Sequence, residues 1–237
     1  KLKGNLLLLL TAVVWGTSFI AQSKGVEEIT PLAFIGIRSI LGGLVLLPVI
    51  ALLDFGKKRK GEKVIKVDKN LITGGVICGI FLCIATVLQT AGMVYTSPGK
   101  AGFITALYMV IVPIIGLFMG KKPSIVIVIS VLIAVTGLYM MCIDSEMSIN
   151  FGDVLIFICA FVFAGHILVI DHFSPKVDGI KLSCLQFFVC GAISTVLMLI
   201  FEEPKLEPIL GCWASIGYSG IMSCGLAYTL QIVGQKY

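Results

Sequence analysis

The feature that most constrains this chain is a series of long apolar stretches separated by short polar joints. Each stretch approaches the roughly 20 residues that an α-helix needs to cross a bilayer, whereas spanning strands would be shorter and alternate in polarity. Eight spanning helices are predicted, at Leu6–Gln22, Leu32–Leu53, Leu71–Met93, Ala101–Gly120, Ser124–Ile143, Val154–Ile170, Leu182–Phe201 and Ile209–Val233. The sequence therefore predicts an all-α integral membrane protein, a polytopic helix bundle.

Composition supports a membrane protein and excludes other classes. Hydrophobic residues make up 58% of the chain and charged residues 13%, against roughly a quarter charged in soluble domains. This balance excludes a disordered chain and a nucleic-acid-binding module. The eight cysteines lie in or beside the apolar stretches without metal-ligand spacing, so they are interpreted as packing residues, and no metal or cofactor is predicted.

The positions of the basic residues predict the orientation in the membrane. If the N-terminus is cytoplasmic, fourteen of the eighteen lysines and arginines lie in inside joints, three lie in outside joints, and Arg38 lies within a span. We therefore expect a multi-pass protein of the cytoplasmic membrane with its N-terminus inside. The basic run from Lys57 to Lys69 is interpreted as a topological anchor, with a lipid-headgroup or partner site as the alternative.

Two motifs recur in order and indicate an internal repeat. Gly4-Asn5-Leu6-Leu7 aligns with Gly152-Asp153-Val154-Leu155 at an offset of 148, and Leu88-Gln89-x-x-Gly92-x-x-Tyr95 aligns with Leu230-Gln231-x-x-Gly234-x-x-Tyr237 at an offset of 142. The first copy spans five helices, an odd number, so the second copy enters the membrane from the opposite side. We expect residues 1–143 to form the first five-helix repeat and residues 152–237 an incomplete second one, containing helices 6–8 and the start of the ninth. Ten helices are expected in the natural protein, about eight of them in this chain.

Three segments resemble one family of transporters. They are Ala12-Val13-Val14-Trp15-Gly16-Thr17-Ser18-Phe19, Pro31-Leu32-Ala33-Phe34-Ile35-Gly36-Ile37-Arg38, and the run from Ser97 through Tyr108 to Val112-Pro113. Together they resemble the EamA-type transporters of the drug/metabolite transporter superfamily. The resemblance implies a permease of two inverted five-helix halves that exports or exchanges small metabolites across the cytoplasmic membrane. It does not select a substrate, and the absence of the ninth and tenth helices departs from the family pattern.

Polar side chains within the spans are the candidate substrate-binding residues, because such groups are costly against lipid. The candidates are Trp15, Ser18, Gln22, Arg38, Gln89, Tyr108, His166, Gln186, Tyr228 and Gln231. Trp15, Ser18 and Gln22 share one helical face, which favours a cavity wall over the alternative of helix packing. The repeat places Trp15 on Phe163, Ser18 on His166 and Arg38 on Gln186.

Several candidates keep alternative roles. Arg38 would reach the membrane surface, pair with a carbonyl, or hold a carboxylate or phosphate of the solute. Gln89 and Gln231 would bind the solute or pair with each other. Proton coupling would require His166 or Asp171, since the first span has no carboxylate; a histidine satisfied within the core is favoured for His166, and facilitated diffusion or exchange stays open.

The function predicted is therefore a membrane permease for small amino-acid-like, polar or anionic solutes that works by alternating access. An enzyme is not expected, because the acidic residues are scattered and no catalytic motif is present. The alternatives are a membrane scaffold or assembly factor without transport activity and a translocase of a lipid-linked substrate. The coupling ion, the transport direction and the oligomeric state are not predicted.

Overall fold

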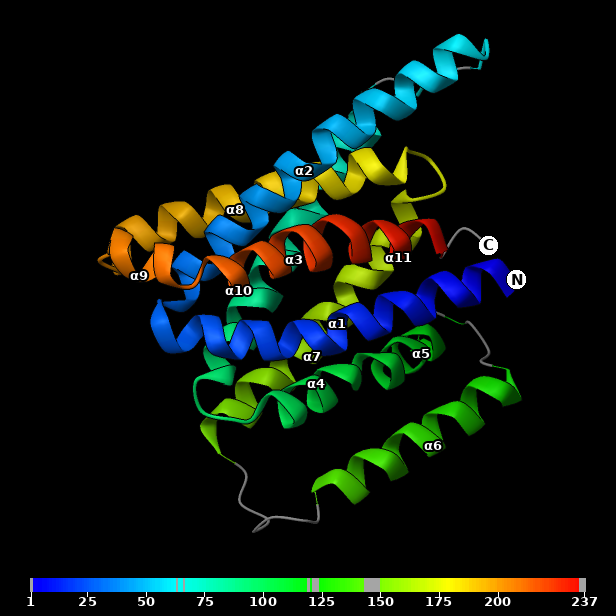
Figure 1. Ribbon diagram of the computed structural model, residues 1–237. Coiled ribbons are helices and arrows are strands. Elements are labelled where there is room, and N and C mark those ends of the chain that lie inside the picture. Colours follow the sequence, from blue (N-terminus) through cyan, green and yellow to red (C-terminus); the bar gives the residue numbers. More distant parts are fainter. Residues whose placement is uncertain are drawn as a thin grey trace.

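A computed structural model describes residues 2–62, 64–65, 67–118, 120, 124–142 and 150–234, and within these residues the regular structure is entirely helical (Figure 1). The elements are α1 (Leu2–Glu28), α2 (Pro31–Arg59), α3 (Lys69–Met93), α4 (Pro98–Ala106), α5 (Tyr108–Phe118), α6 (Ile125–Cys142), α7 (Phe151–Phe173), α8 (Gly179–Phe201), α9 (Leu206–Gly211), α10 (Trp213–Gly217), the π-helix η1 (Tyr218–Ala227) and α11 (Tyr228–Gly234). Lys1, Lys63, Lys66, Lys121, Lys122, Ile143, Lys236 and Tyr237 lie outside the described residues.

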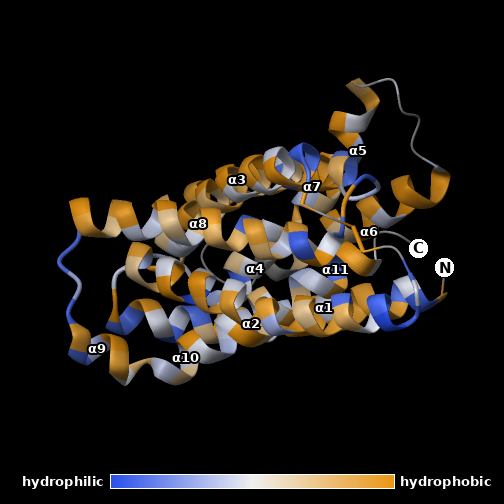
Figure 2. Cartoon of the chain, turned by 90° about the horizontal axis from the view of Figure 1, so that it is seen from above, coloured by the Kyte–Doolittle hydropathy of each residue, from blue (hydrophilic) through white to orange (hydrophobic). Residues whose placement is uncertain are grey.

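The described helices confirm the predicted polytopic helix bundle. Seven helical segments are long and apolar enough to cross a membrane, with α4–α5 and α10–η1–α11 each counted as one, and α6 adds a shorter apolar helix, Ile125–Gly137. Two predicted spans are interrupted: the fourth divides at Leu107, and the eighth divides at Cys212 and continues through the π-helix. Figure 2 shows mainly hydrophobic residues along the helices, with hydrophilic stretches near the N-terminus and before α9.

An antiparallel pair, α2 and α8, runs through the bundle. Phe188 lies against Gly43, and Ile40 lies against Gly191 on the other helix. These two contacts are related by the repeat offset of 148, which carries residue 40 to 188 and residue 43 to 191. Small residues at both crossings let the two backbones approach closely, as is usual between membrane helices.

The flanking helices pair in the same reciprocal way. α1 packs antiparallel to the α10–η1–α11 segment, and α3 packs antiparallel to α7 (Figure 1). A Cβ atom on Gly92 would lie 2.8 Å from the Gly152 carbonyl oxygen, and one on Gly234 would lie 3.4 Å from the Gly4 carbonyl oxygen. The four glycines of the two repeated motifs thus meet in two equivalent crossings, although the division of the chain into two repeats stays a prediction.

Polar contacts fix α2 to α8 at the end where α8 begins. Lys57 Nζ lies 3.0 Å from Asp178 Oδ2, and Lys181 Nζ lies 2.7 Å from Asp54 Oδ2. Asp178 also caps α8 by accepting hydrogen bonds from the backbone of Ile180 and Lys181. Burial by itself would raise the pKa of Asp178, but the hydrogen bonds from Lys57 and the α8 backbone outweigh it and lower that pKa below its ordinary value.

Glu202 fixes the opposite end of the same pair. Its carboxylate accepts hydrogen bonds from the Thr30 hydroxyl at 2.5 Å and from the backbone N–H groups of Leu32 and Ala33 at 3.2 and 3.1 Å. Thr30 is the N-cap residue of α2, but its side chain makes no capping hydrogen bond. The first turn of α2 is therefore capped by a residue 172 positions further along the chain.

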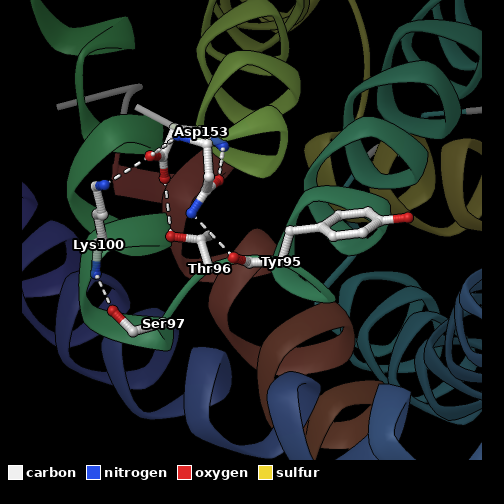
Figure 3. Close-up of polar contacts among 6 residues, drawn as sticks. Tyr95, Thr96, Ser97, Lys100 and Asp153 are labelled. Atoms are coloured by element: carbon white, nitrogen blue, oxygen red, sulfur yellow. Dashed lines mark hydrogen bonds and ion pairs between the residues drawn. The ribbon is translucent and has the colours of Figure 1, made fainter. Parts of the chain in front are cut away.

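A second polar cluster joins the start of α7 to the α3–α4 connection (Figure 3). Asp153 accepts hydrogen bonds from Thr96 Oγ1 at 2.8 Å and from Lys100 Nζ at 2.6 Å. Asn150 forms a capping box with Asp153 and donates from Nδ2 to the Tyr95 carbonyl oxygen at 2.9 Å. These contacts fix the first turn of α7 against the end of α3.

Candidate substrate-binding site

Aromatic rings from five spans form a connected cluster inside the bundle. Tyr228 lies at its centre, with its ring centroid 4.9 Å from that of Trp15, 5.1 Å from Phe187 and 6.3 Å from His166. Phe163 extends the cluster, 6.4 Å from His166 and 6.4 Å from Tyr108. We call these six residues the ring cluster. The edge-on contacts among them match the usual preference of aromatic pairs.

Four of the predicted site residues are thereby brought together from distant parts of the sequence. Trp15 comes from α1, Tyr108 from the start of α5, His166 from α7 and Tyr228 from the start of α11. Tyr228 and His166 are buried. Trp15 is partly exposed, but its Nε1 atom is buried and has no hydrogen-bond partner among the described residues. The cluster therefore combines apolar ring surface with a free donor.

Gln186, which precedes Phe187 on α8, contacts the ring cluster through His166. His166 Nε2 lies 3.0 Å from Gln186 Oε1, and both side chains are buried. With the Gln186 oxygen facing the ring, this contact is a hydrogen bond in the tautomer of His166 that carries its proton on Nε2. The favoured prediction that His166 is satisfied within the core agrees with this bond. Gln186 Nε2 remains a buried donor without a partner in the described part of the chain.

Arg38 is buried in α2, with a relative exposure of 4%. Its guanidinium carbon lies 5.4 Å from the centroid of the Phe34 ring. No aspartate or glutamate of the described residues forms an ion pair with it, and its Nε has no hydrogen-bond partner there. Its burial is inconsistent with the alternative in which Arg38 reaches the membrane surface.

Within the described residues, no hydrogen bond joins the four remaining predicted residues to the ring cluster. Ser18 and Gln22 are buried on the same face of α1 as predicted, with Gln22 Nε2 3.4 Å from Ser18 Oγ. Gln89 donates to Thr105 Oγ1 at 3.1 Å, and Gln231 Oε1 has no partner among the described residues. The alternative in which Gln89 and Gln231 pair with each other is therefore wrong.

The structure also reveals a polar seam between α2, α3 and α8 that the sequence analysis missed. Cys190 Sγ lies 3.6 Å from Ser39 Oγ and 3.9 Å from Thr86 Oγ1, and Cys83 Sγ lies 3.4 Å from Ser194 Oγ. Interpreting every cysteine as a packing residue concealed these contacts. The helical spacing of Cys83 with Thr86, and of Cys190 with Ser194, is the sequence signal that would have indicated a polar face.

Both donors and acceptors are found among the buried polar atoms that have no partner in the described residues. Trp15 Nε1, Arg38 Nε and Gln186 Nε2 are all donors without partners in the described residues, and Arg38 adds a positive charge. Gln22 Oε1 and Gln231 Oε1 are acceptors without partners there, and a buried polar group left without a partner costs about 1–3 kcal/mol. Within the described residues no three histidine, cysteine or acidic side chains gather in a way that could hold a metal ion.

The helices and the buried polar centre define a multi-pass α-helical membrane protein. The family model described as "EamA-like transporter family" matches residues 2–143 and 150–237. The chain belongs to the EamA-like transporter family.

Individual relatives agree with this membership. The chain is 29% identical over 208 residues to an uncharacterized transporter of Archaeoglobus fulgidus, covering 87% of this chain and 61% of the relative. It is 20% identical over 226 residues to the uncharacterized transporter YoaV of Bacillus subtilis, covering 92% and 74%. It is 30% identical over 139 residues to the protein PagO of Salmonella typhimurium, covering 58% and 43%. The chain thus spans about three fifths of the length of the Archaeoglobus relative.

One solved crystal structure has the same fold. It matches with a TM-score of 0.72 at 18% sequence identity, covering 100% of this chain and 80% of the other. This likeness concerns the arrangement of the helices alone.

Proposed function

We propose that this protein is a permease that exports or exchanges small amino-acid-like, polar or anionic solutes across the cytoplasmic membrane by alternating access. The solute binds at the ring cluster together with Arg38 and Gln186. The N-terminus faces the cytoplasm, because the basic residues concentrate in the joints on that side. The two relatives named as transporters support the general activity.

The observation that carries the proposal is the buried charge of Arg38. A charged side chain within a membrane helix is expensive unless it is paired, and none of the described carboxylates pairs with Arg38. An anionic group on the solute would complete the pair. The planar guanidinium forms two parallel hydrogen bonds with a carboxylate or a phosphate, a geometry that an ammonium group does not reproduce.

The ring cluster supports a role in binding the rest of the solute. Small-molecule sites combine mostly apolar walls with a few polar groups that fix orientation. Trp15, Phe187 and Tyr228 supply the apolar surface, while Trp15 Nε1 and Gln186 Nε2 supply donors. Transporters built from inverted repeats place such sites where the two repeats meet, and α1, α8 and α11 would meet there in the proposed division of the chain.

Exchange transport in proteoliposomes tests the proposal. The purified protein is reconstituted and loaded with unlabelled solute, and uptake of labelled amino acids and phosphorylated sugars is followed with and without a pH gradient. We expect saturable uptake of at least one anionic or zwitterionic solute that falls at least tenfold in Arg38→Ala and also in Arg38→Lys. The gradient reports whether protons are coupled to transport.

Lys24→Ala is the matched control, because it removes an exposed positive charge from α1 without touching the ring cluster. It should transport like the parent protein. No saturable flux of any of these solutes through folded, inserted protein would contradict the proposal and favour a scaffold or a translocase of a lipid-linked substrate. Normal transport by Arg38→Lys would contradict the two-pronged contact.

A further inference from the structure

The helix that leads into Tyr228 differs from the other described helices. Residues Tyr218–Ala227 form a π-helix of ten residues, and Tyr228 is the first residue of the α-helix that follows. A π-helix closes hydrogen bonds from i to i+5, so each turn holds more residues than an α-helical turn. Segments of this kind are rare and occur often at functional sites.

The register of this segment determines where the ring of Tyr228 points. Each residue of an α-helix turns the chain by about 100°, so a shift of one residue between π and α register turns the following side chain by about that angle. Tyr228 contacts Trp15 and Phe187 at centroid distances of 4.9 and 5.1 Å. A turn of that size would remove its ring from both contacts.

Hydrogen bonds from α1 hold the π segment at its two ends. The Thr17 and Tyr218 hydroxyls lie 2.5 Å apart, and Thr11 Oγ1 lies 3.3 Å from the Ala227 carbonyl oxygen. Thr11 Oγ1 also lies 2.9 Å from the Leu7 carbonyl oxygen in its own helix. The Thr11 hydroxyl has one proton, which it can donate to either carbonyl oxygen. If a change of register moves the Ala227 carbonyl away, the hydroxyl still donates to the Leu7 carbonyl and keeps a hydrogen bond.

The side of the π segment facing α2 is built from small residues. A Cβ atom on Gly220 would lie 3.0 Å from the Arg38 carbonyl oxygen, and one on Gly42 would lie 2.5 Å from Cys224 Cβ. Ser219 is fully buried, and its hydroxyl has no partner among the described residues. The segment thus passes directly beside Arg38 with one polar group available for a new hydrogen bond.

The corresponding segment of the first repeated motif has the ordinary geometry. At the offset of 142, Tyr218–Ala227 corresponds to residues 76–85, which lie within the regular α-helix α3. α3 packs along α8 much as η1 packs along α2. The same type of packing is therefore made without a π-helix, so the packing alone does not explain the π register.

We propose that residues Tyr218–Ala227 change between π and α register during the transport cycle, and that this change turns Tyr228 into and out of the ring cluster. This inference rests on the proposed function in taking the ring cluster as the solute's site. In the π register Tyr228 closes the cluster against Trp15. In the α register its ring leaves, and the surface of Trp15 and Phe187 becomes available to the solute.

Deletion of Ile221 tests the proposal by removing the surplus residue. Ile221 is exposed, and its deletion leaves nine residues in place of the ten that form the π-helix. We expect amides 218–227 of the parent to exchange hydrogen at least tenfold faster than amides 76–85, and the deletion to remove that difference. Ile221→Ala, which keeps the residue count, should retain the fast exchange.

Fluorescence of Trp15 reports the position of Tyr228. Trp213→Phe removes the exposed second tryptophan of the chain. In that background Tyr228→Ala should shift the Trp15 emission, whereas the deletion variant should keep the parent emission because Tyr228 is locked in the cluster. Emission equal to that of Tyr228→Ala in the deletion variant would overturn the proposal.

Equal protection of the two amide segments in the parent would also overturn it, and this comparison holds even if the deletion variant fails to fold. Neither readout uses transport. A failure of the register change is therefore distinguishable from a failure of the proposed permease activity.

Discussion

The cap that Glu202 provides to α2 allows a quantitative prediction. Replacing Glu202 with alanine removes the acceptor for the backbone N–H groups of Leu32 and Ala33 and for the Thr30 hydroxyl. Pro31 occupies the first turn and has no N–H, and the Thr30 side chain makes no capping bond. Glu202 is therefore the side chain that satisfies the start of α2, and its loss removes the acceptor of two backbone N–H groups and of the Thr30 hydroxyl.

The expected loss of stability follows from the type of interaction. Removing an N-cap acceptor costs about 0.5–2 kcal/mol, and losing a negative charge from a helix N-terminus costs a further 0.3–1 kcal/mol or so. Because Glu202 is partly exposed, we expect a total of about 1–2 kcal/mol. For a chain of this size that corresponds to a decrease of roughly 2–8 °C in the unfolding midpoint. Glu202→Gln, which retains an acceptor oxygen, should lose about half as much.

Thermal unfolding of detergent-solubilised protein, followed by circular dichroism, measures this effect. Glu203→Ala is the matched control, because Glu203 is the next residue, carries the same charge and is exposed. Its midpoint should stay within about 1 °C of the parent, as is usual for surface substitutions. Equal midpoints for the Glu202 and Glu203 variants would refute the capping argument.

Two further predictions concern the ends and the crossings of the helices. Asp178→Asn keeps the cap of α8 but removes the charge paired with Lys57. Since the folded-state pKa of Asp178 is lowered, the parent should be more stable than this variant near pH 7. The difference in midpoint should shrink as the pH falls through about 4, the ordinary pKa, and vanish only below the folded-state pKa. Gly92→Ala would place a Cβ atom 2.5 Å from Ile156 Cγ1 and should destabilise the protein by about 1–3 kcal/mol, whereas Gly99→Ala, where nothing lies within 4 Å, should unfold at the parent temperature in the same assay.

The sequence predicted the bundle well because hydrophobic length is a strong signal in membrane proteins. Within the described residues its predicted spans coincide with helices, apart from the breaks at Leu107 and Cys212 and the span ends at Gly120 and Ser124. It did not predict the interruption at Leu107 or the π-helix before Tyr228, because an uninterrupted apolar run looks the same for a continuous helix and for one that changes register. Hydrogen-bond register depends on the helices packed alongside, which hydropathy does not describe.

The candidate site was predictable in part. The helical spacing of Trp15, Ser18 and Gln22 predicted a shared helical face, and Ser18 and Gln22 are buried while Trp15 is partly exposed. The repeat predicted His166 on the equivalent face of the sixth span, and His166 is buried. The contact between Trp15 and Tyr228 was not predictable, since it joins residues more than 200 positions apart. Phe187 was missed for a related reason, because a phenylalanine in an apolar span carries no signal beyond packing.

The hydrogen-bond partners of the two glutamines could not be predicted from their positions in the sequence. Gln89 and Gln231 occupy corresponding places in the two motifs, which made a mutual hydrogen bond plausible. Gln89 instead donates to Thr105 on the next helix, a residue 16 positions away along the chain. Helix rotation decides which neighbour a polar side chain meets, and sequence spacing alone fixes that rotation only within one helix.

The most direct test of the central claim is counterflow of a labelled solute in proteoliposomes containing parent protein, Arg38→Ala or Lys24→Ala. Vesicles preloaded with an unlabelled carboxylate or phosphate solute should take up the labelled form saturably with the parent and with Lys24→Ala. Uptake should fall at least tenfold with Arg38→Ala, because the buried charge that completes the ion pair is gone. Equal uptake by Arg38→Ala and the parent would contradict the assignment of Arg38 to the solute's site.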